Sequence, residues 1–266
     1  MKSRLIILGA SALALMLLIL TLTSSATKPI VISHPMIKQS STSFTSSVYS
    51  LNWAGYAVPA KEGTVTSVAG SFIVPSVTCT EQTTYVALWV GLDGYNDSTV
   101  EQAGILGECE HGEAHYYVWY EFYPSAAVFL SSMTAAPGDK VYINVTHISG
   151  DYFKINITII PIKGKVESSI LGGSVSGADL SSAECILERP MVNGHLSTLA
   201  NFGEAYYGQD YTNILNTCYA TIGGVTGPFG SFSSVVSITM VNYNGKVLAS
   251  PSSLTPDGSS FIVTYG

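Results

Sequence analysis

The sequence predicts an all-β fold, a sandwich or barrel of antiparallel strands. Residues that favour strands are abundant, with 16 tyrosines among 266 residues. Short β-rich runs recur at close spacing and are separated by turns that contain glycine or proline. Beyond residue 26, no long segment repeats its apolar residues every 3.6 positions, which an amphipathic helix requires.

The predicted strands follow one another along residues 65–74, 83–92, 115–123, 140–148, 152–162, 182–189, 235–241, 246–249 and 260–265. The clearest pair flanks Ser149-Gly150-Asp151, whose turn-forming residues predict a hairpin. Apolar and polar residues alternate in 141–146 and 153–158, so one face of each strand should meet water.

The N-terminus has the pattern of an export signal over residues 1–26, expected as an apolar helix. Lys2 and Arg4 precede an apolar run over 5–22, and small residues follow at 24–26. The run is also near the short end of a spanning helix, so a retained membrane anchor is the alternative. Residues 27–50, rich in Ser and Thr, predict a linker or a short propeptide before one domain at 51–266. We therefore expect a secreted protein, or one anchored at the cell surface.

The charge balance argues against nucleic acid as a partner. The chain has 11 Lys and Arg against 18 Asp and Glu, a net charge of -7. Nucleic-acid binding needs a basic surface, which this composition does not supply. Few basic residues also limit self-repulsion in acid, although a hydroxyl-rich extracellular surface has the same composition. We expect a monomer.

The four cysteines are Cys79, Cys109, Cys185 and Cys218. An even number in an exported chain predicts disulfides, and three pairings remain open. No Cys-x-x-Cys pair occurs, which disfavours a structural zinc site.

Several catalytic patterns are missing from the sequence. It contains no Gly-x-Ser-x-Gly elbow, no His-Glu-x-x-His helix motif and no Asp-Thr/Ser-Gly pair. His111 and His115 flank a glycine in a predicted loop, so we interpret them as surface histidines rather than a metal pair. The expectation is an enzyme without metal or cofactor.

The remaining chemistry is carried by segments rich in Trp, Gln and Glu. They are WVGLDG at 89–94, VEQAGI at 100–105, WYEFYP at 119–124 and AECILERP at 183–190. With NWAGY at 52–56 and LANFG at 199–203, they resemble the glutamic peptidases, or eqolisins, in the same order along the chain. The resemblance covers about residues 51–266 and is to the bacterial or archaeal kind of member. Cys185 departs from it, since relatives usually carry Trp there.

This resemblance implies a two-sheet antiparallel β-sandwich, a concanavalin-like jelly roll with seven strands in each sheet. It also implies a catalytic dyad of Gln102 and Glu188 that acts on polypeptide substrates. Further residues are expected to bind substrate or support the dyad, namely Trp53, Trp89, Asp93, Trp119 and Glu121.

The chemistry of these two side chains suits amide hydrolysis in acid. A glutamate with an ordinary pKa of about 4.3 is partly ionised near pH 4 and can take a proton from water. A glutamine side chain both donates and accepts hydrogen bonds, and it does not titrate. The sequence thus predicts a secreted acid endopeptidase with Glu188 as base and acid and Gln102 as the group that orients water and stabilises the oxyanion.

Each of these residues also has a structural explanation. A glutamine on a strand is usually solvated, Glu188 beside Arg189 could be a surface carboxylate, and the tryptophans could be core anchors. The alternative function is an extracellular β-sandwich that binds carbohydrate or hydrolyses glycosides, with Glu188 paired to another carboxylate.

Overall fold

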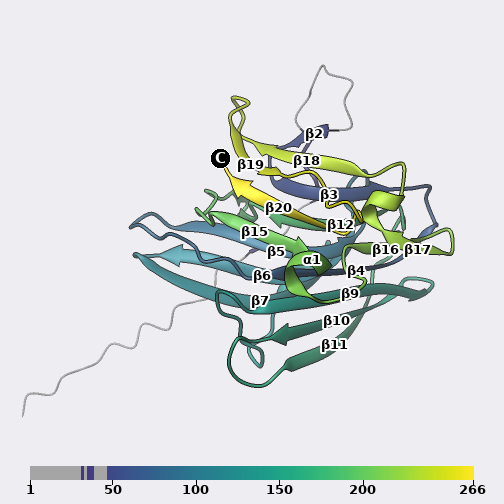
Figure 1. Ribbon diagram of the computed structural model, residues 1–266, viewed down its shortest axis with the longest axis horizontal. Helices are drawn as coiled ribbons and strands as arrows, with labels where there is room; N and C mark the ends of the chain where they lie inside the picture. The colour runs from purple at the N-terminus through teal and green to yellow at the C-terminus, as the bar shows by residue number, and fades with distance from the viewer. Residues whose placement is uncertain (1–30, 33–34, 39–46) are drawn as a thin grey trace, which may run out of the picture.

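The computed structural model describes residues 31–32, 35–38 and 47–266. The predicted signal helix and most of the predicted linker lie outside these residues. The described part is built almost wholly of strands, with one short helix, α1 (Gln209–Thr212), and one 3-10 turn, η1 (Phe229–Ser231) (Figure 1). The all-β prediction is therefore confirmed. No helix in the described part is long and apolar enough to cross a membrane.

One layer of the fold, which we call sheet I, carries the motifs singled out above. Its strands pair antiparallel in the order β7 (Glu113–Tyr123), β6 (Val100–Glu110), β5 (Thr84–Leu92), β12 (Ser182–Glu188), β3 (Trp53–Pro59) and β18 (Val236–Val241). The short β8 (Val128–Phe129) extends the β7 edge, and β2 (Ser47–Ser50) runs parallel to β18.

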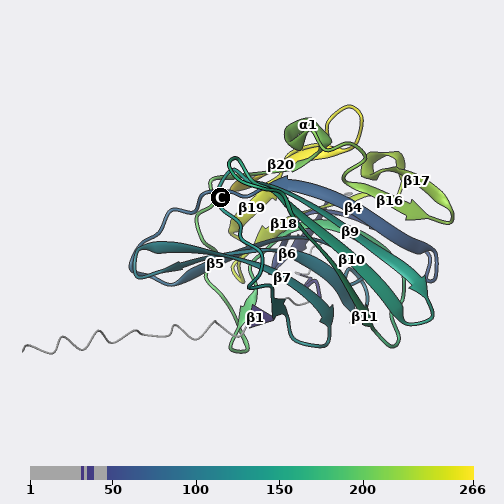
Figure 2. The ribbon, with the colours of Figure 1, turned by 90° about the horizontal axis from the view of Figure 1, so that it is seen from below.

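The second layer, sheet II, continues from β18 through a register shift. Its strands pair in the order β19 (Val247–Pro251), β20 (Ser260–Tyr265), β15 (Glu204–Gly208), β4 (Val65–Ile73), β9 (Lys140–Ser149), β10 (Tyr152–Ile160) and β11 (Glu167–Ser174). The hairpin of β16 (Tyr219–Ile222) and β17 (Val225–Pro228) pairs with β4. Figure 2 shows β4, β9, β10 and β11 running side by side as one curved layer. A separate small sheet joins β1 (Val31–Ile32), β13 (Met191–Val192) and β14 (His195–Leu196).

The main core lies between the two sheets. Val86, Leu88 and Val90 of β5 belong to the same buried cluster as Val141 and Ile143 of β9. The residues of β9 and β10 alternate between buried and more exposed, as the hairpin pattern predicted. Strand β5 differs because both of its faces are buried, and its burial pattern is almost continuous.

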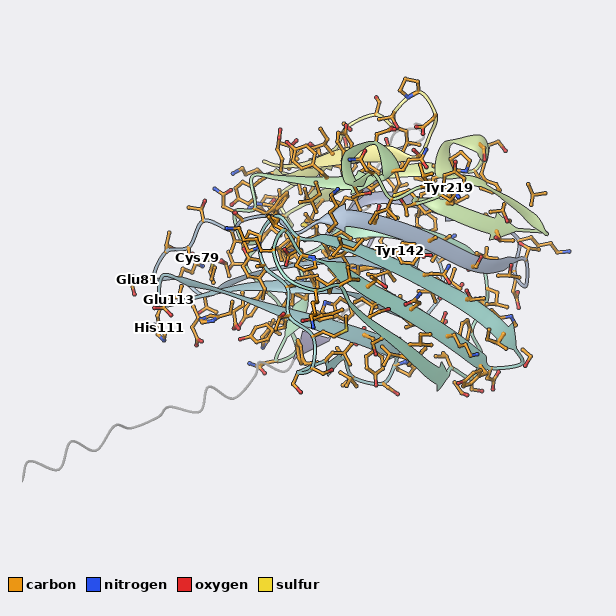
Figure 3. The ribbon with its side chains drawn as sticks, turned by 60° about the horizontal axis from the view of Figure 1, so that its bottom comes forward. Cys79, Glu81, His111, Glu113, Tyr142 and Tyr219 are labelled. Carbon is orange, nitrogen blue, oxygen red and sulfur yellow. A yellow bond between two sulfur atoms is a disulfide. The ribbon has the colours of Figure 1, made fainter. Side chains whose placement is uncertain are left out.

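The sequence did not predict every strand. Among the strands not predicted are β3, the full length of β6, and β11. In β11 the apolar side chain of Ile170 is 73% exposed, so the apolar positions do not mark the buried face. The structure does supply one disulfide, Cys79–Cys109, which ties the end of β6 to the loop before β5. Figure 3 shows Cys79 at the same end of the molecule as His111 and Glu113. Cys185 and Cys218 are buried free thiols with their Sγ atoms 3.2 Å apart. The jelly-roll connectivity stays a prediction.

Candidate active site

Gln102 and Glu188 lie on one face of sheet I, on either side of β5. In the strand register Gln102 is opposite Gly91, and Glu188 is opposite Ala87. Gly91, Trp89 and Ala87 alternate along β5, so all of these residues share a face. Both predicted dyad side chains are fully buried. A solvated Gln102 and a surface Glu188, the structural explanations considered above, are therefore wrong.

Glu188 is held by two buried donors. The indole Nε1 of Trp89 donates to Oε2 at 2.8 Å, and the Nδ2 of Asn52 donates to Oε1 at 3.4 Å. Each carboxyl oxygen thus accepts a hydrogen bond, which fixes the orientation of the group. Asn52 directly precedes β3, and its backbone carbonyl accepts from the N–H of Arg189, so the start of β3 and the end of β12 are joined here.

Gln102 is oriented from the neighbouring strand. Its Nε2 donates to Oε2 of Glu121 at 2.7 Å, and the two residues are directly opposite in the β6–β7 hairpin. Glu121 is fully buried, so its predicted supporting position beside Gln102 has a structural basis. Because Nε2 donates and the carboxyl oxygen accepts, this bond fixes which way the amide group points.

Gly91 lets the two halves of the site approach each other. A Cβ atom at this position would lie 2.8 Å from Cβ of Gln102 and 3.2 Å from Cζ3 of Trp89. The indole ring therefore reaches Gly91, against which Gln102 also packs, while its Nε1 bonds Glu188. Trp89 thus bonds Glu188 on one side of β5 and lies beside Gly91, the residue opposite Gln102.

The tryptophans predicted for the site all belong to one buried cluster on this face of sheet I. Trp53 is opposite Glu188 in the register, and its ring meets Trp89 edge-on with centroids 4.8 Å apart. Trp119 is 3% exposed and belongs to the same cluster. The cluster is distinct from the core between the sheets, so these rings line the Gln102 and Glu188 face.

Asp93 has a different position from the other predicted residues. Its carboxylate accepts hydrogen bonds from the backbone N–H groups of Leu180 at 2.8 Å and Ser181 at 2.6 Å. It therefore connects the end of β5 to the loop that leads into β12. Burial raises the pKa of Asp93 to about 6, against the effect of these donors.

The sequence reasoning also did not single out Glu101 and Glu184, two of the further acids that the fold buries. Burial, together with the charges of Asp93 and Asp97, raises the pKa of Glu101 to about 10. Burial likewise raises the pKa of Glu184 well above its ordinary value. Both are therefore neutral in the acid range. The alternation of Glu184 with Glu188 was visible in the sequence, whereas nothing there distinguished Glu101 or the contact of Asn52 with Glu188.

No metal centre is evident in the part of the chain that the structure describes, where no group of three or more His, Cys, Asp or Glu side chains could hold an ion. His111 lies in the exposed turn between β6 and β7, with its side chain 83% exposed (Figure 3). This position fits the interpretation of a surface histidine.

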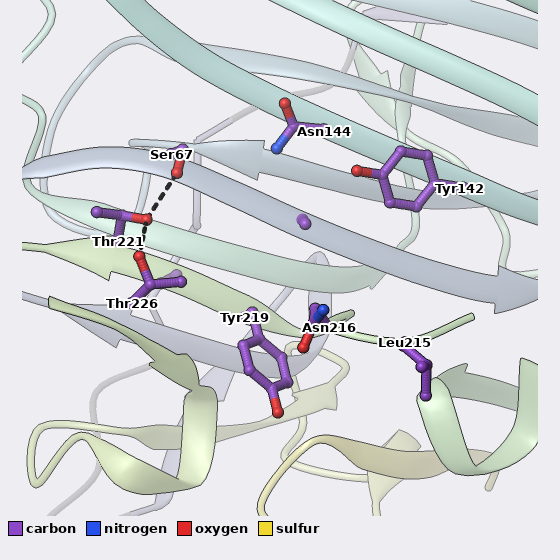
Figure 4. Close-up of a pocket in the computed structure, with 10 residues that line it drawn as sticks. Ser67, Tyr142, Asn144, Leu215, Asn216, Tyr219, Thr221 and Thr226 are labelled. Atoms are coloured by element: carbon purple, nitrogen blue, oxygen red, sulfur yellow. Dashed lines mark hydrogen bonds between the residues drawn. The ribbon is translucent and has the colours of Figure 1, made fainter. Parts of the chain in front are cut away.

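A polar pocket of about 540 Å³ lies away from these residues, on the outer face of sheet II. Tyr142, Asn144 and Tyr219 line it, and Thr221 hydrogen-bonds to Ser67 at 2.9 Å within it (Figure 4). It contains none of the predicted site residues.

The chain matches the model of the Peptidase A4 family over residues 51–265. Aspergillopepsin-2 of Aspergillus niger is 32% identical over 247 residues, which cover 83% of this chain and 79% of that protein. A crystal structure of scytalido-glutamic peptidase with a transition state analog inhibitor aligns with a TM-score of 0.65 at 20% identity, over 81% of this chain and 98% of that chain. The crystal structure of aspergilloglutamic peptidase from Aspergillus niger aligns with a TM-score of 0.57 at 26% identity, over 69% and 99%. The chain therefore belongs to the Peptidase A4 family of glutamic peptidases and is a hydrolase of that type.

Proposed function

We propose that this chain is an acid endopeptidase that cleaves polypeptides through a dyad of Glu188 and Gln102. The observation that carries the proposal is the pair of buried, individually hydrogen-bonded polar side chains on one face of sheet I, one on each side of β5. Buried polar groups are costly unless they are paired, so two of them in an aromatic-lined face mark a functional site.

In the proposed reaction Glu188 acts first as base and then as acid. Its carboxylate takes a proton from water, and the water oxygen attacks the carbonyl carbon of the substrate. The protonated Glu188 then gives the proton to the amide nitrogen, and the C–N bond breaks. The donors Trp89 and Asn52 keep its carboxyl group in place throughout both steps.

Gln102 supplies the neutral donor of the proposed site. Its Nε2 donates to Glu121, and a side-chain amide can both donate and accept, so in the proposed reaction it orients the water and polarises the carbonyl group of the substrate. A preorganised donor stabilises the negative charge that develops on the carbonyl oxygen. Because an amide does not titrate, this contribution persists in acid.

We also propose that the protein is exported from the cell. Residues 1–26 have the pattern of a signal, and the relatives named above are peptidases, so we propose an extracellular enzyme. For the strand connectivity we propose the concanavalin-like jelly roll.

The test is hydrolysis of a denatured protein over a range of pH, with Gln102→Ala. We expect an acid optimum and a loss of about a hundredfold or more in rate, since one oxyanion donor contributes roughly 2.7–4 kcal/mol. Gln82→Ala is the matched control, because Gln82 is an exposed glutamine whose removal should leave the rate unchanged. Full activity of folded Gln102→Ala, an optimum at or above neutral pH, or cleavage of glycans in place of protein would each refute the proposal.

A further inference from the structure

Cys185 and Cys218 form a pair of thiols in contact between the two sheets. Their Sγ atoms are 3.2 Å apart, and both side chains are fully buried in the main apolar core. A single buried cysteine behaves as a small apolar residue. Two cysteines whose sulfur atoms touch are also placed to form a covalent bond. Since Cys79 and Cys109 are joined to each other, these two are the remaining cysteines of the chain.

The two thiols reach each other from opposite layers of the fold. Cys185 lies in the middle of β12, where Tyr56 of β3 and Val90 of β5 are opposite it in the register of sheet I. Cys218 directly precedes β16, whose hairpin pairs with β4 of sheet II. The two cysteines are 33 positions apart in the chain. A bond between them would therefore join the two sheets through their common core.

Gly70 makes room for this contact on the side of sheet II. It lies in β4, and a Cβ atom there would be 2.9 Å from Sγ of Cys185 and 2.5 Å from Cγ2 of Val90. Both distances are shorter than an ordinary van der Waals contact. The absence of a side chain at Gly70 thus lets the thiol of Cys185 extend across the interior towards sheet II.

Cys218 is held at the contact by the backbone and by its neighbour in the chain. The N–H of Phe229 donates to the carbonyl of Cys218 at 2.9 Å. Thr217, the preceding residue, is fully buried, and its Oγ1 accepts from Ser71 and donates to the carbonyl of Ile214, both at 2.7 Å. Because Ser71 belongs to β4, these bonds tie the position of Cys218 to sheet II.

We propose that Cys185 and Cys218 are a modification site, at which a small-molecule disulfide of the glutathione type oxidises the two thiols to a second disulfide that joins β12 to sheet II. The thiolate of one cysteine attacks a sulfur of the oxidant and displaces one thiol, and the other cysteine then attacks the mixed disulfide and displaces the second thiol. The Sγ–Sγ bond of the protein forms and that of the oxidant breaks. The two electrons and two protons that the protein loses leave with the two thiols. This bond does not depend on the proposed role of Glu188, although Glu188 ends the same strand.

Burial determines when the bond can form. The attacking species is the thiolate, whereas burial and the hydrogen bond with Cys218 raise the pKa of Cys185 well above its ordinary value. The thiols of the folded protein are therefore slow to react, and we expect the bond to form while the chain folds, before the sheets close over the sulfur atoms. Once formed, it restricts the unfolded chain and so stabilises the fold.

The first experiment refolds the reduced and denatured full chain in a mixture of reduced and oxidised glutathione. Remaining thiols are blocked with iodoacetamide in denaturant, and the peptides are mapped by mass spectrometry without reduction. We expect Cys185 and Cys218 in one linked pair of peptides in most of the protein, beside the Cys79–Cys109 pair. A sample refolded in dithiothreitol and then transferred to oxidised glutathione for the same time should keep Cys185 and Cys218 unlinked.

Thermal unfolding gives a second readout, with Cys218→Ala as the matched control because it keeps Cys185 and the Cys79–Cys109 bond. Refolding in dithiothreitol removes both disulfides from the parent but only Cys79–Cys109 from the variant. The resulting decrease in Tm should be greater in the parent by roughly 4–16 °C, the contribution expected of one disulfide in a domain of this size.

Several outcomes would overturn the proposal. Alkylated Cys185 and Cys218 in the chain refolded with glutathione, or either of them linked to another cysteine, would exclude the bond. Equal decreases in Tm in the parent and Cys218→Ala would exclude its stabilising effect, and equally fast linkage in the folded dithiol protein would contradict formation before burial. If Cys218→Ala does not fold, the peptide map decides, because it uses only the unaltered chain.

Discussion

Replacement of Glu188 by glutamine separates the chemistry of this residue from its structural contribution. The two side chains have nearly the same shape, but glutamine cannot accept a proton from water. It also has one acceptor oxygen where the carboxylate has two. The expected result is a folded protein with almost no hydrolysis, and the structure allows both effects to be given a magnitude.

The cost in stability follows from the two donors that face Glu188. If the new amide oxygen turns to Trp89, the 2.8 Å bond from Nε1 is kept. The new NH2 group then faces Nδ2 of Asn52, which is also a donor. A buried donor that loses its acceptor costs about 1–3 kcal/mol. In a domain of this size each kcal/mol lowers Tm by about 2–4 °C, so we expect a decrease of roughly 2–12 °C.

The effect on rate should be far larger than this change in Tm. General base catalysis contributes about 10²–10⁴-fold, so at least that factor should be lost from kcat. Glu184→Gln is the matched control, because Glu184 is equally buried, lies on the same face of β12 four residues earlier, and is already neutral in the fold. The assay is hydrolysis of a denatured protein near pH 4, with thermal unfolding followed by circular dichroism. A folded Glu188→Gln enzyme within about tenfold of the parent, or an equal loss in Glu184→Gln, would refute the assignment of Glu188 as the base.

Three further predictions follow from the described contacts. Gly91→Ala should destabilise the fold by about 1–3 kcal/mol and slow hydrolysis, since its Cβ would lie 2.8 Å from Cβ of Gln102 and 3.0 Å from the carbonyl oxygen of Glu101. Gly107→Ala should destabilise it less and leave kcat unchanged, because its nearest neighbour is the side chain of Val86 at 3.3 Å. Equal effects of the two substitutions in thermal melts and on kcat would contradict this. The pKa of Glu101 is raised to about 10, so above about pH 4.3 the unfolded chain releases a proton that the folded chain keeps. The free energy of unfolding should therefore fall as pH rises, by up to about 1.4 kcal/mol per pH unit. Urea unfolding at pH 4 and pH 7 should show a smaller fall in Glu101→Gln, and an unchanged fall would exclude Glu101 as its source. Cys185 and Cys218 are buried, and the pKa of the Cys185 thiol is raised, so neither should react with iodoacetamide until the protein is denatured. Mass spectrometry of the native protein should find neither cysteine alkylated. Alkylation before unfolding would show that the space around the two thiols is open to solvent.

Local patterns in the sequence were enough for the fold class and for several strands. The turn residues 149–151 between two β-rich runs predicted the β9–β10 hairpin. The alternation in 141–146 and 153–158 predicted one solvated face, because successive side chains on a strand point to opposite faces. The same rule placed Glu184, Ile186 and Glu188 on one face of β12. Strand prediction failed for β6, because burial of both faces removes the alternation of apolar and polar residues. It also failed for β11, where the apolar residue Ile170 is exposed.

The order of the motifs carried the sequence further than periodicity could, since it identified the family and nominated Gln102 and Glu188. The contacts that make a site of these residues come only from the tertiary structure. Asn52 and Glu188 are 136 positions apart and Trp89 and Glu188 are 99 apart, and these pairs meet because of the register among β3, β5 and β12. Register between distant strands is set by the packing of the whole sandwich, so no local pattern encodes it.

Burial and its effect on charge were likewise decided by the fold. In the sequence Glu101, Glu184 and Glu188 look alike, three acidic residues in β-rich segments. The structure buries all three but gives hydrogen-bond donors to Glu188, while Glu101 and Glu184 have their pKa raised by desolvation. The sequence by itself determined which residue types lie along each strand. Only the packing of the two sheets decided which carboxyl group receives hydrogen-bond donors and which are desolvated, because both effects depend on neighbours that are distant in the chain.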